Sequence, residues 1–178
     1  MLNMKFKIPI YKHSVKEVDV FKEDEKLGTM QRYNKNPFIH RFGRHISHKL
    51  IANIRVTEPK GNTVKYDISA DNPWQRMIKM GTFSIYDSHS LIGHAGENRK
   101  LGVILNFSIG DKKYRAFSKI KELRKINFYN ITGDSEIHIG AAERTLNPAV
   151  NEMNICLNED NDLAPLLVAG LCYLHTMI

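Results

Sequence analysis

The chain has 178 residues, of which 42% are hydrophobic and 25% are charged, and its formal net charge is +7. This is the composition of an ordinary globular domain, and it excludes a chain that is disordered over most of its length. Residues 1–178 fit one domain with its own core. The excess of positive charge favours anionic partners, such as nucleic acid or acidic lipid headgroups, and it equally serves solubility.

The cysteines and the first residues bear on the cellular compartment. Cys156 and Cys172 lie in apolar surroundings, with no further Cys or His at the spacing of a zinc finger. We therefore expect buried free thiols and a reducing compartment. Residues 1–7 show no secretion signal, which predicts a cytoplasmic protein.

A short motif occurs three times along the chain. Each copy has an apolar strand, a polar turn, an apolar residue followed by glycine, and a second strand that closes on an arginine. This order is typical of a β-hairpin. We expect the glycines to serve a β-bulge or a close approach of strands, and the arginines to pair with turn carboxylates. The copies span residues 18–32, 83–99 and 129–144, and their glycines are Gly28, Gly93 and Gly140.

Alternation of apolar and polar residues predicts further strands between and around these copies. Pro9 places the first of them at a sheet edge or at a bulge. About ten strands, with no amphipathic helix among them, predict an all-β body. The additional strands are expected at residues 5–11, 50–56, 63–68, 74–80, 103–109, 114–117 and 150–157.

The last segment, residues 163–178, is apolar on every face. We expect Asp162 to be its N-cap and Pro165 to lie in its first turn. A helix that is hydrophobic all round must be buried in protein or in lipid. Its length of about 24 Å falls short of a bilayer core of about 30 Å, so a buried protein helix is favoured. A tail anchor and a membrane-surface helix are the alternatives.

A helix about 10 Å across needs roughly twelve strands around it. We therefore expect a mainly β (α+β) fold, a single-domain antiparallel barrel of about 10–12 strands that encloses a C-terminal hydrophobic helix. The repeated hairpin and the terminal Pro-Leu-Leu-x-Ala-x-x-x-Tyr segment resemble the tubby C-terminal-like superfamily over residues 5–178. That group includes tubby proteins, phospholipid scramblases and LURP-one-related proteins, and the chain is most similar to its small bacterial members.

The resemblance implies an antiparallel barrel around a central hydrophobic helix. Tubby proteins bind phosphoinositide through basic residues on a particular helix and strand, but those positions have no match in this chain. The resemblance therefore implies a binding domain without assigning a lipid site to particular residues.

A basic stretch interleaved with aromatic residues follows the first hairpin. Tyr33, Phe38 and Phe42 lie among its cations, and this combination suits phosphate contact together with insertion between headgroups or stacking on bases. A charged, solvated face around core aromatics is the alternative. A second basic run, residues 112–125, is interpreted as the outward face of two strands. The candidate anion- or lipid-binding residues are Arg32, Lys35, Arg41, Arg44 and Lys49, to which Arg55 adds a further cation.

Signatures of catalysis and of metal binding are absent from the sequence. Asp and Glu are missing between Glu25 and Glu58, so the cluster of histidines in that region lacks carboxylate ligands and we expect no metal. No phosphate-binding loop, dinucleotide fingerprint or nucleophile elbow occurs, so we expect neither a cofactor nor an enzyme. The histidines are His40, His45 and His48; Asp87 with His89, and Asp134 with His138, are attributed to turn chemistry.

The sequence thus predicts a non-enzymatic tubby-like binding domain that docks on anionic phospholipid headgroups at the inner face of the membrane, without a transmembrane span. A protein–protein interaction or scaffolding module, whose partner the sequence does not identify, is the first alternative. A basic barrel that binds single-stranded nucleic acid is a less favoured one.

Overall fold

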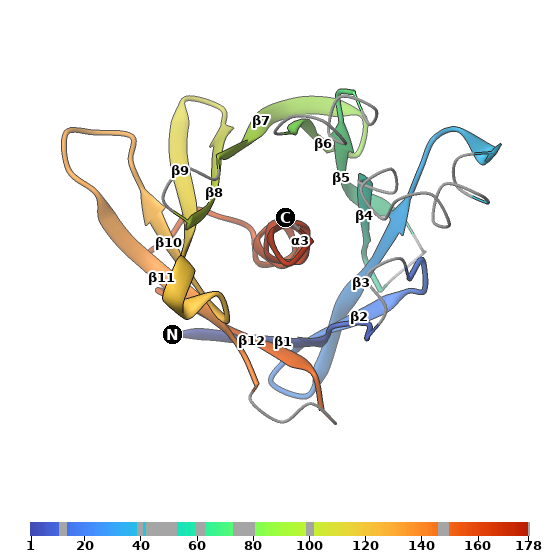
Figure 1. Ribbon diagram of the computed structural model, residues 1–178, viewed down its shortest axis with the longest axis horizontal. Coiled ribbons are helices and arrows are strands. Elements are labelled where there is room, and N and C mark those ends of the chain that lie inside the picture. Colours follow the sequence, from blue (N-terminus) through green and yellow to red (C-terminus); the bar gives the residue numbers. More distant parts are fainter. Residues whose placement is uncertain are drawn as a thin grey trace.

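The computed structural model describes residues 1–10, 14–38, 41, 53–59, 63–72, 81–98, 102–145 and 150–177. Within these ranges twelve antiparallel strands form a closed barrel, in which each strand pairs with its neighbours along the chain and β1 pairs with β12. The α-helix α3 lies in the middle of the ring of strands (Figure 1). The sequence-based expectation of a barrel of about 10–12 strands around the terminal helix is confirmed.

The elements follow one another in the order of the barrel. The strands are β1 (Leu2–Lys7), β2 (Val18–Lys22), β3 (Glu25–Tyr33), β4 (Asn53–Thr57), β5 (Val64–Ala70), β6 (Thr82–Asp87), β7 (Ser90–Asn98), β8 (Gly102–Ile109), β9 (Lys112–Lys119), β10 (Lys125–Asn130), β11 (Ile137–Arg144) and β12 (Glu152–Leu157). A 3-10 turn, η3 (Ile120–Glu122), links β9 to β10, and α3 (Pro165–His175) follows β12.

The central helix forms the middle of the hydrophobic core. Every residue of α3 after Pro165 is buried. Gly170 lets the helix approach β4 and β5 closely, because an added Cβ would lie 2.9 Å from Val56 Cγ2 and 3.2 Å from Ile68 Cδ1. On the other side, Tyr173 packs edge-on against Phe6 of β1, with 5.9 Å between the ring centroids. No described helix is long and apolar enough to cross a membrane.

The start of α3 differs from the expectation. The helix begins at Pro165, the cap position is Ala164, and no side chain caps it, so the prediction of Asp162 as N-cap is wrong. The residue before a proline is held out of the α region, and Ala164 is accordingly extended, with ψ at 132°. The helix therefore cannot begin earlier. Asp162 forms an ion pair with Lys112 instead.

The three repeated hairpins share one irregularity. In each of them the strand register shifts by one residue at the apolar-Gly pair, which leaves the apolar residue without a partner opposite it. These are β-bulges, which bend a strand and increase its twist. The prediction for the three glycines is confirmed. The extra residues are Leu27, Ile92 and Ile139, and they directly precede Gly28, Gly93 and Gly140.

Glycine is required at these bulges because the next strand passes close by. A Cβ on Gly93 would lie 1.8 Å from the carbonyl oxygen of Ser108, and one on Gly140 would lie 2.4 Å from that of Cys156. Gly140 also has a positive φ of 155°, which residues with a side chain rarely adopt. Steric exclusion at the bulge thus explains the apolar-Gly repeat.

Four further expectations have different outcomes. β1 ends at Lys7, before Pro9, and pairs on both sides with β2 and β12, so its assignment to a sheet edge is wrong because barrel closure leaves no edge. Arg144 donates from Nε to Asn151 Oδ1 at 2.7 Å rather than to a turn carboxylate. The strand expected at 74–80 lies outside the described residues. Cys172 is buried and Cys156 is half-buried, and both are free.

The direction of α3 distinguishes the two ends of the barrel. The chain passes from β12 into α3 at one end, which we call the entry end; the turns that follow even-numbered strands lie there. The helix ends at the opposite end, the exit end, where His175 lies against Val103 at the start of β8. The connections that follow odd-numbered strands, η3 among them, lie at the exit end.

The bulge glycines allow a test by matched substitutions. Gly93→Ala should lower the free energy of unfolding by about 1–3 kcal/mol, because the new methyl group overlaps the backbone of β8. Gly96→Ala on the same strand should change it by less than about 0.5 kcal/mol, since nothing lies within 4 Å of a Cβ there. Urea unfolding monitored by circular dichroism measures both; equal effects would contradict the role assigned to Gly93.

His175 predicts an acid dependence of stability. Its side chain is 5% exposed, its Nε2 lies 3.1 Å from the Val103 carbonyl oxygen, and burial lowers its pKa to about 4. The unfolded chain binds a proton near the ordinary pKa of about 6.5, so this contribution is present above that pH and is lost as the pH falls towards 4.

We expect the free energy of unfolding of the wild-type protein to decrease by up to about 3 kcal/mol relative to His175→Gln over this pH window. Urea titrations of both proteins at a series of pH values measure the difference. A difference that does not change with pH would show that His175 binds a proton in the folded protein as readily as in the unfolded chain.

Candidate functional site

Charge is segregated between the two ends of the barrel. In the described connections of the entry end, carboxylates occur without lysine or arginine; they are Glu23, Asp24, Glu58, Asp111, Asp134, Glu136, Glu159, Asp160 and Asp162. The described connections of the exit end carry the cations Lys16, Lys35, Arg41, Lys121 and Arg124, with the carboxylates Glu17, Asp71 and Glu122. Four of the entry-end carboxylates, Asp24, Glu136, Glu159 and Asp162, form ion pairs with Lys5, Arg115, the N-terminal amine and Lys112. The difference in charge between the two sets of connections favours an anionic partner at the exit end.

Two of the candidate anion-binding residues lie on this cationic end. Lys35 and Arg41 are exposed in the connection that follows β3. The ammonium group of Lys35 lies 5.7 Å from the centroid of the Tyr86 ring, within range of a cation–π contact. The sequence-based grouping of cations with aromatic residues therefore has a structural basis at Lys35. Arg44 and Lys49 lie outside the described residues.

Arg32 has a different location. It is 1% exposed, it pairs in register with the core residue Ile54, and it lies near Tyr173 on the central helix. Successive side chains of a strand point to opposite faces of the sheet. Met30 and Arg32 are two residues apart in β3, so both side chains point into the barrel. The guanidinium group is therefore in the core, and Arg32 is removed from the surface group in which the sequence analysis placed it.

Next to Lys35, the outer face of β3, β4 and β5 carries a compact polar network. The Tyr33 hydroxyl donates to Asp67 Oδ2 at 2.5 Å, and Ser69 donates to Asp67 Oδ1 at 2.7 Å. The guanidinium carbon of Arg55 lies 4.5 Å from the centroid of the Tyr33 ring. The Nε of Arg55 is buried and has no hydrogen-bond partner in the described part of the chain.

This network holds a cation in place and does not activate a nucleophile. Burial and the hydrogen bond to Asp67 raise the pKa of Tyr33 to about 12, so the phenol stays protonated at physiological pH. The Tyr33 ring restricts the Arg55 guanidinium, which is stacked on it. Tyr33 and Arg55 of this set were predicted from the sequence, whereas Asp67 and Ser69 were not. Asp67 and Ser69 are two residues apart in β5, and this spacing places them on one face of the sheet.

One member of each Asp–His pair that was attributed to turn chemistry contacts another residue. Asp87 Oδ1 lies 3.0 Å from the ammonium nitrogen of Lys65, and the ring of His138 packs edge-on against Tyr129. Among the described residues there is no group of three or more side chains that could hold a metal ion. The histidines His40, His45 and His48 lie outside the described ranges.

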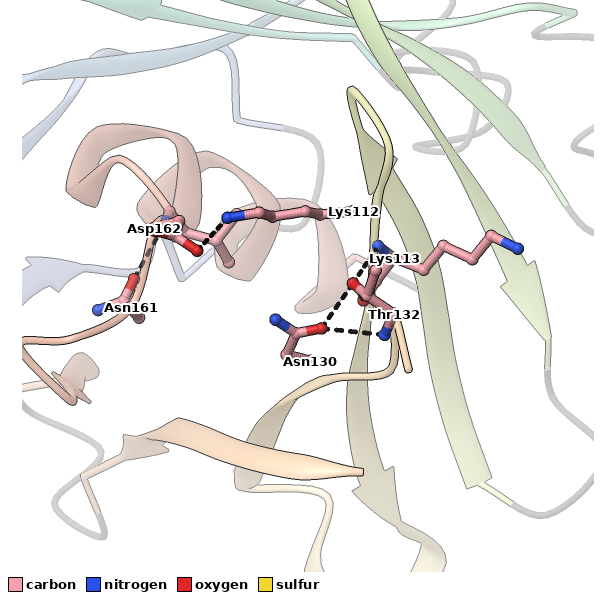
Figure 2. Close-up of polar contacts among 7 residues, drawn as sticks. Lys112, Lys113, Asn130, Thr132, Asn161 and Asp162 are labelled. Atoms are coloured by element: carbon pink, nitrogen blue, oxygen red, sulfur yellow. Dashed lines mark hydrogen bonds and ion pairs between the residues drawn. The ribbon is translucent and has the colours of Figure 1, made fainter. Parts of the chain in front are cut away.

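At the entry end, polar contacts fasten the segment that leads into α3. Figure 2 shows the ion pair between Lys112 of β9 and Asp162, which ties this segment to the turn between β8 and β9. Beside it, Thr132 Oγ1 accepts from the Lys113 backbone N–H at 2.9 Å and donates to Asn130 Oδ1 at 2.6 Å. The Lys113 side chain extends away from this cluster. Of these contacts, the ion pair of Asp162 holds the segment that leads into the helix.

Tyr33 and Tyr129 offer a matched pair of substitutions. Tyr33→Phe should lower the free energy of unfolding by about 1–3 kcal/mol, because the half-buried Asp67 carboxylate loses a donor. Tyr129→Phe should change it by less than about 0.5 kcal/mol, since its hydroxyl makes no hydrogen bond with a described residue. Chemical denaturation at neutral pH measures both; a neutral Tyr33→Phe would mean that the network adds nothing to stability.

Comparison with known proteins agrees with the fold and the resemblance. A family model described as the Tubby C-terminal like domain matches residues 5–178. No curated protein and no solved structure matches the chain. The match covers nearly all of the sequence, and the closed barrel around a hydrophobic helix is the architecture that the resemblance implied. The chain therefore belongs to the tubby C-terminal like domain family.

Proposed function

We propose that this tubby-like domain is a non-enzymatic binding module that docks through its exit end on anionic phospholipid headgroups at the cytoplasmic face of a membrane. The observation that carries the proposal is the segregation of charge, which presents Lys35, Arg41 and neighbouring cations on one end while the carboxylates of the turns gather on the other. Such an arrangement orients the barrel in the field of a negatively charged surface.

The local contacts around Lys35 support the same function. Lys35 is stacked on Tyr86 and Arg55 on Tyr33, and the structure shows no ion pair between either cation and a described carboxylate. A phosphate can then accept from Lys35 without displacing an ion pair. Because such contacts lie at the protein surface, their strength must fall as the salt concentration rises.

Binding to vesicles tests the proposal. Lys35→Glu combined with Arg41→Glu should weaken binding to phosphatidylserine-containing vesicles by about 2 kcal/mol or more, since each basic residue near the surface contributes about 1 kcal/mol. Neutral phosphatidylcholine vesicles should bind neither protein. Pelleting at low and at physiological ionic strength gives the affinities, and a melting curve checks that the variant is folded.

The control carries the same change of charge at the other end of the barrel. Lys22→Glu with Lys113→Glu should leave binding within about twofold of wild type, because the entry end faces away from the membrane. Equal losses in the two variants would assign the effect to net charge alone. Titration of a short single-stranded oligonucleotide beside the vesicles covers the nucleic-acid alternative, and stoichiometric co-purification of a protein without lipid would favour the scaffolding alternative.

A further inference from the structure

We propose that the turn between β9 and β10 inserts two apolar side chains, Ile120 and Leu123, into the outer layer of an anionic bilayer. The inference rests on the proposed docking function and assigns to it a second membrane contact, distinct from the cations that follow β3. The turn comprises η3, Leu123 and Arg124, and it lies at the exit end.

The two apolar side chains are not part of the core. Ile120 is 67% exposed and Leu123 is 59% exposed, and no residue of η3 is buried. A single exposed apolar side chain needs no explanation. Here two occur within one short turn that projects beyond the strands, where they add exposed apolar surface without stabilising the barrel.

Four cations flank this apolar pair. Lys119 and Lys121 adjoin Ile120, and Arg124 and Lys125 follow Leu123. The structure shows no ion pair and no side-chain hydrogen bond between these cations and any described residue, and Glu122 is the carboxylate of the turn. The sequence analysis assigned this run to the outward face of two strands, but residues 120–124 form a turn outside them. Apolar tips between unpaired cations are typical of segments that lie in a membrane interface.

Other exposed apolar residues at the same end favour a bilayer over a protein as the occupant. Ile10, Phe38 and Val150 are exposed in three other connections of the exit end. Protein partners of standard size cover a continuous, shape-matched surface of about 800 Å² on each side. A bilayer interface is a plane and contacts separate loops at once, and its negative charge complements the cations of this end.

Vesicles of phosphatidylcholine with roughly one third phosphatidylserine test the proposal with the full chain. Ile120→Ser combined with Leu123→Ser should lower the affinity about tenfold or more, because two apolar side chains lose their burial in lipid. The loss should persist at high salt, since it is not electrostatic. The control, Leu91→Ser with Ile137→Ser, removes exposed apolar side chains at the entry end and should bind like wild type.

Fluorescence gives a readout that a change in fold stability would not produce. Leu123→Trp should be quenched by vesicles with brominated acyl chains, whereas Leu91→Trp, at a position that is 53% exposed at the entry end, should not. Both variants carry Trp74→Phe, so that each protein has a single tryptophan. Quenching of Leu123→Trp alone is the expected result.

The outcomes separate this inference from the proposed function. The insertion is overturned if vesicle binding is unchanged in the serine variant and Leu123→Trp is not quenched. Headgroup docking is still sustained in that case if Lys35→Glu with Arg41→Glu weakens vesicle binding. Quenching of Leu123→Trp, together with binding that is insensitive to Lys35→Glu with Arg41→Glu, sustains the insertion and overturns headgroup docking. Absence of binding by the wild-type protein overturns both. If the serine variant changes only the association state of the protein, the apolar pair is a protein contact and the inference is wrong.

Discussion

Burial of α3 is the constraint on which the rest of the structure depends. A helix without a polar face has to be covered on all sides, and its diameter of about 10 Å demands a barrel wider than one filled by side chains alone. Twelve strands provide that width, and closure between β1 and β12 leaves every strand paired on both sides. The glycine bulges in three hairpins let neighbouring backbones approach closely while the strands bend around the helix.

Closure of the barrel also places successive connections between strands at opposite ends of the molecule. Because neighbouring strands are antiparallel and even in number, connections after odd-numbered strands lie at one end and those after even-numbered strands at the other. Short acidic turns alternate along the sequence with longer basic connections, so carboxylates gather at the entry end and cations at the exit end. The carbonyl end of α3 lies at the cationic end. The proposed docking function uses the polarity that this topology creates.

Two polar groups near the core, Asp67 and Asn151, are satisfied locally, which separates them from the surface on which binding is proposed. Asp67 accepts from Tyr33 and Ser69, and Asn151 both accepts from Arg144 and donates to the Ile8 carbonyl oxygen. Two groups of exposed cations at the exit end differ from these: Lys35 is stacked on the Tyr86 ring, and Lys121 and Arg124 lie in the turn between β9 and β10. They retain positive charge that a phosphate-bearing surface can neutralise, while the buried contacts maintain the barrel that presents them.

The hairpins, their glycine bulges and the burial of the terminal helix could be predicted from the sequence, because each depends on local spacing and on apolar content. The grouping of Lys35 and Arg41 with aromatic residues could be predicted as well. The inward position of Arg32, the start of α3 at Pro165 without an Asp162 cap, and the exposure of Ile120 and Leu123 became visible in the three-dimensional fold. The physical reason is that a side chain's surroundings depend on strand parity, register and distant neighbours, which local patterns do not specify.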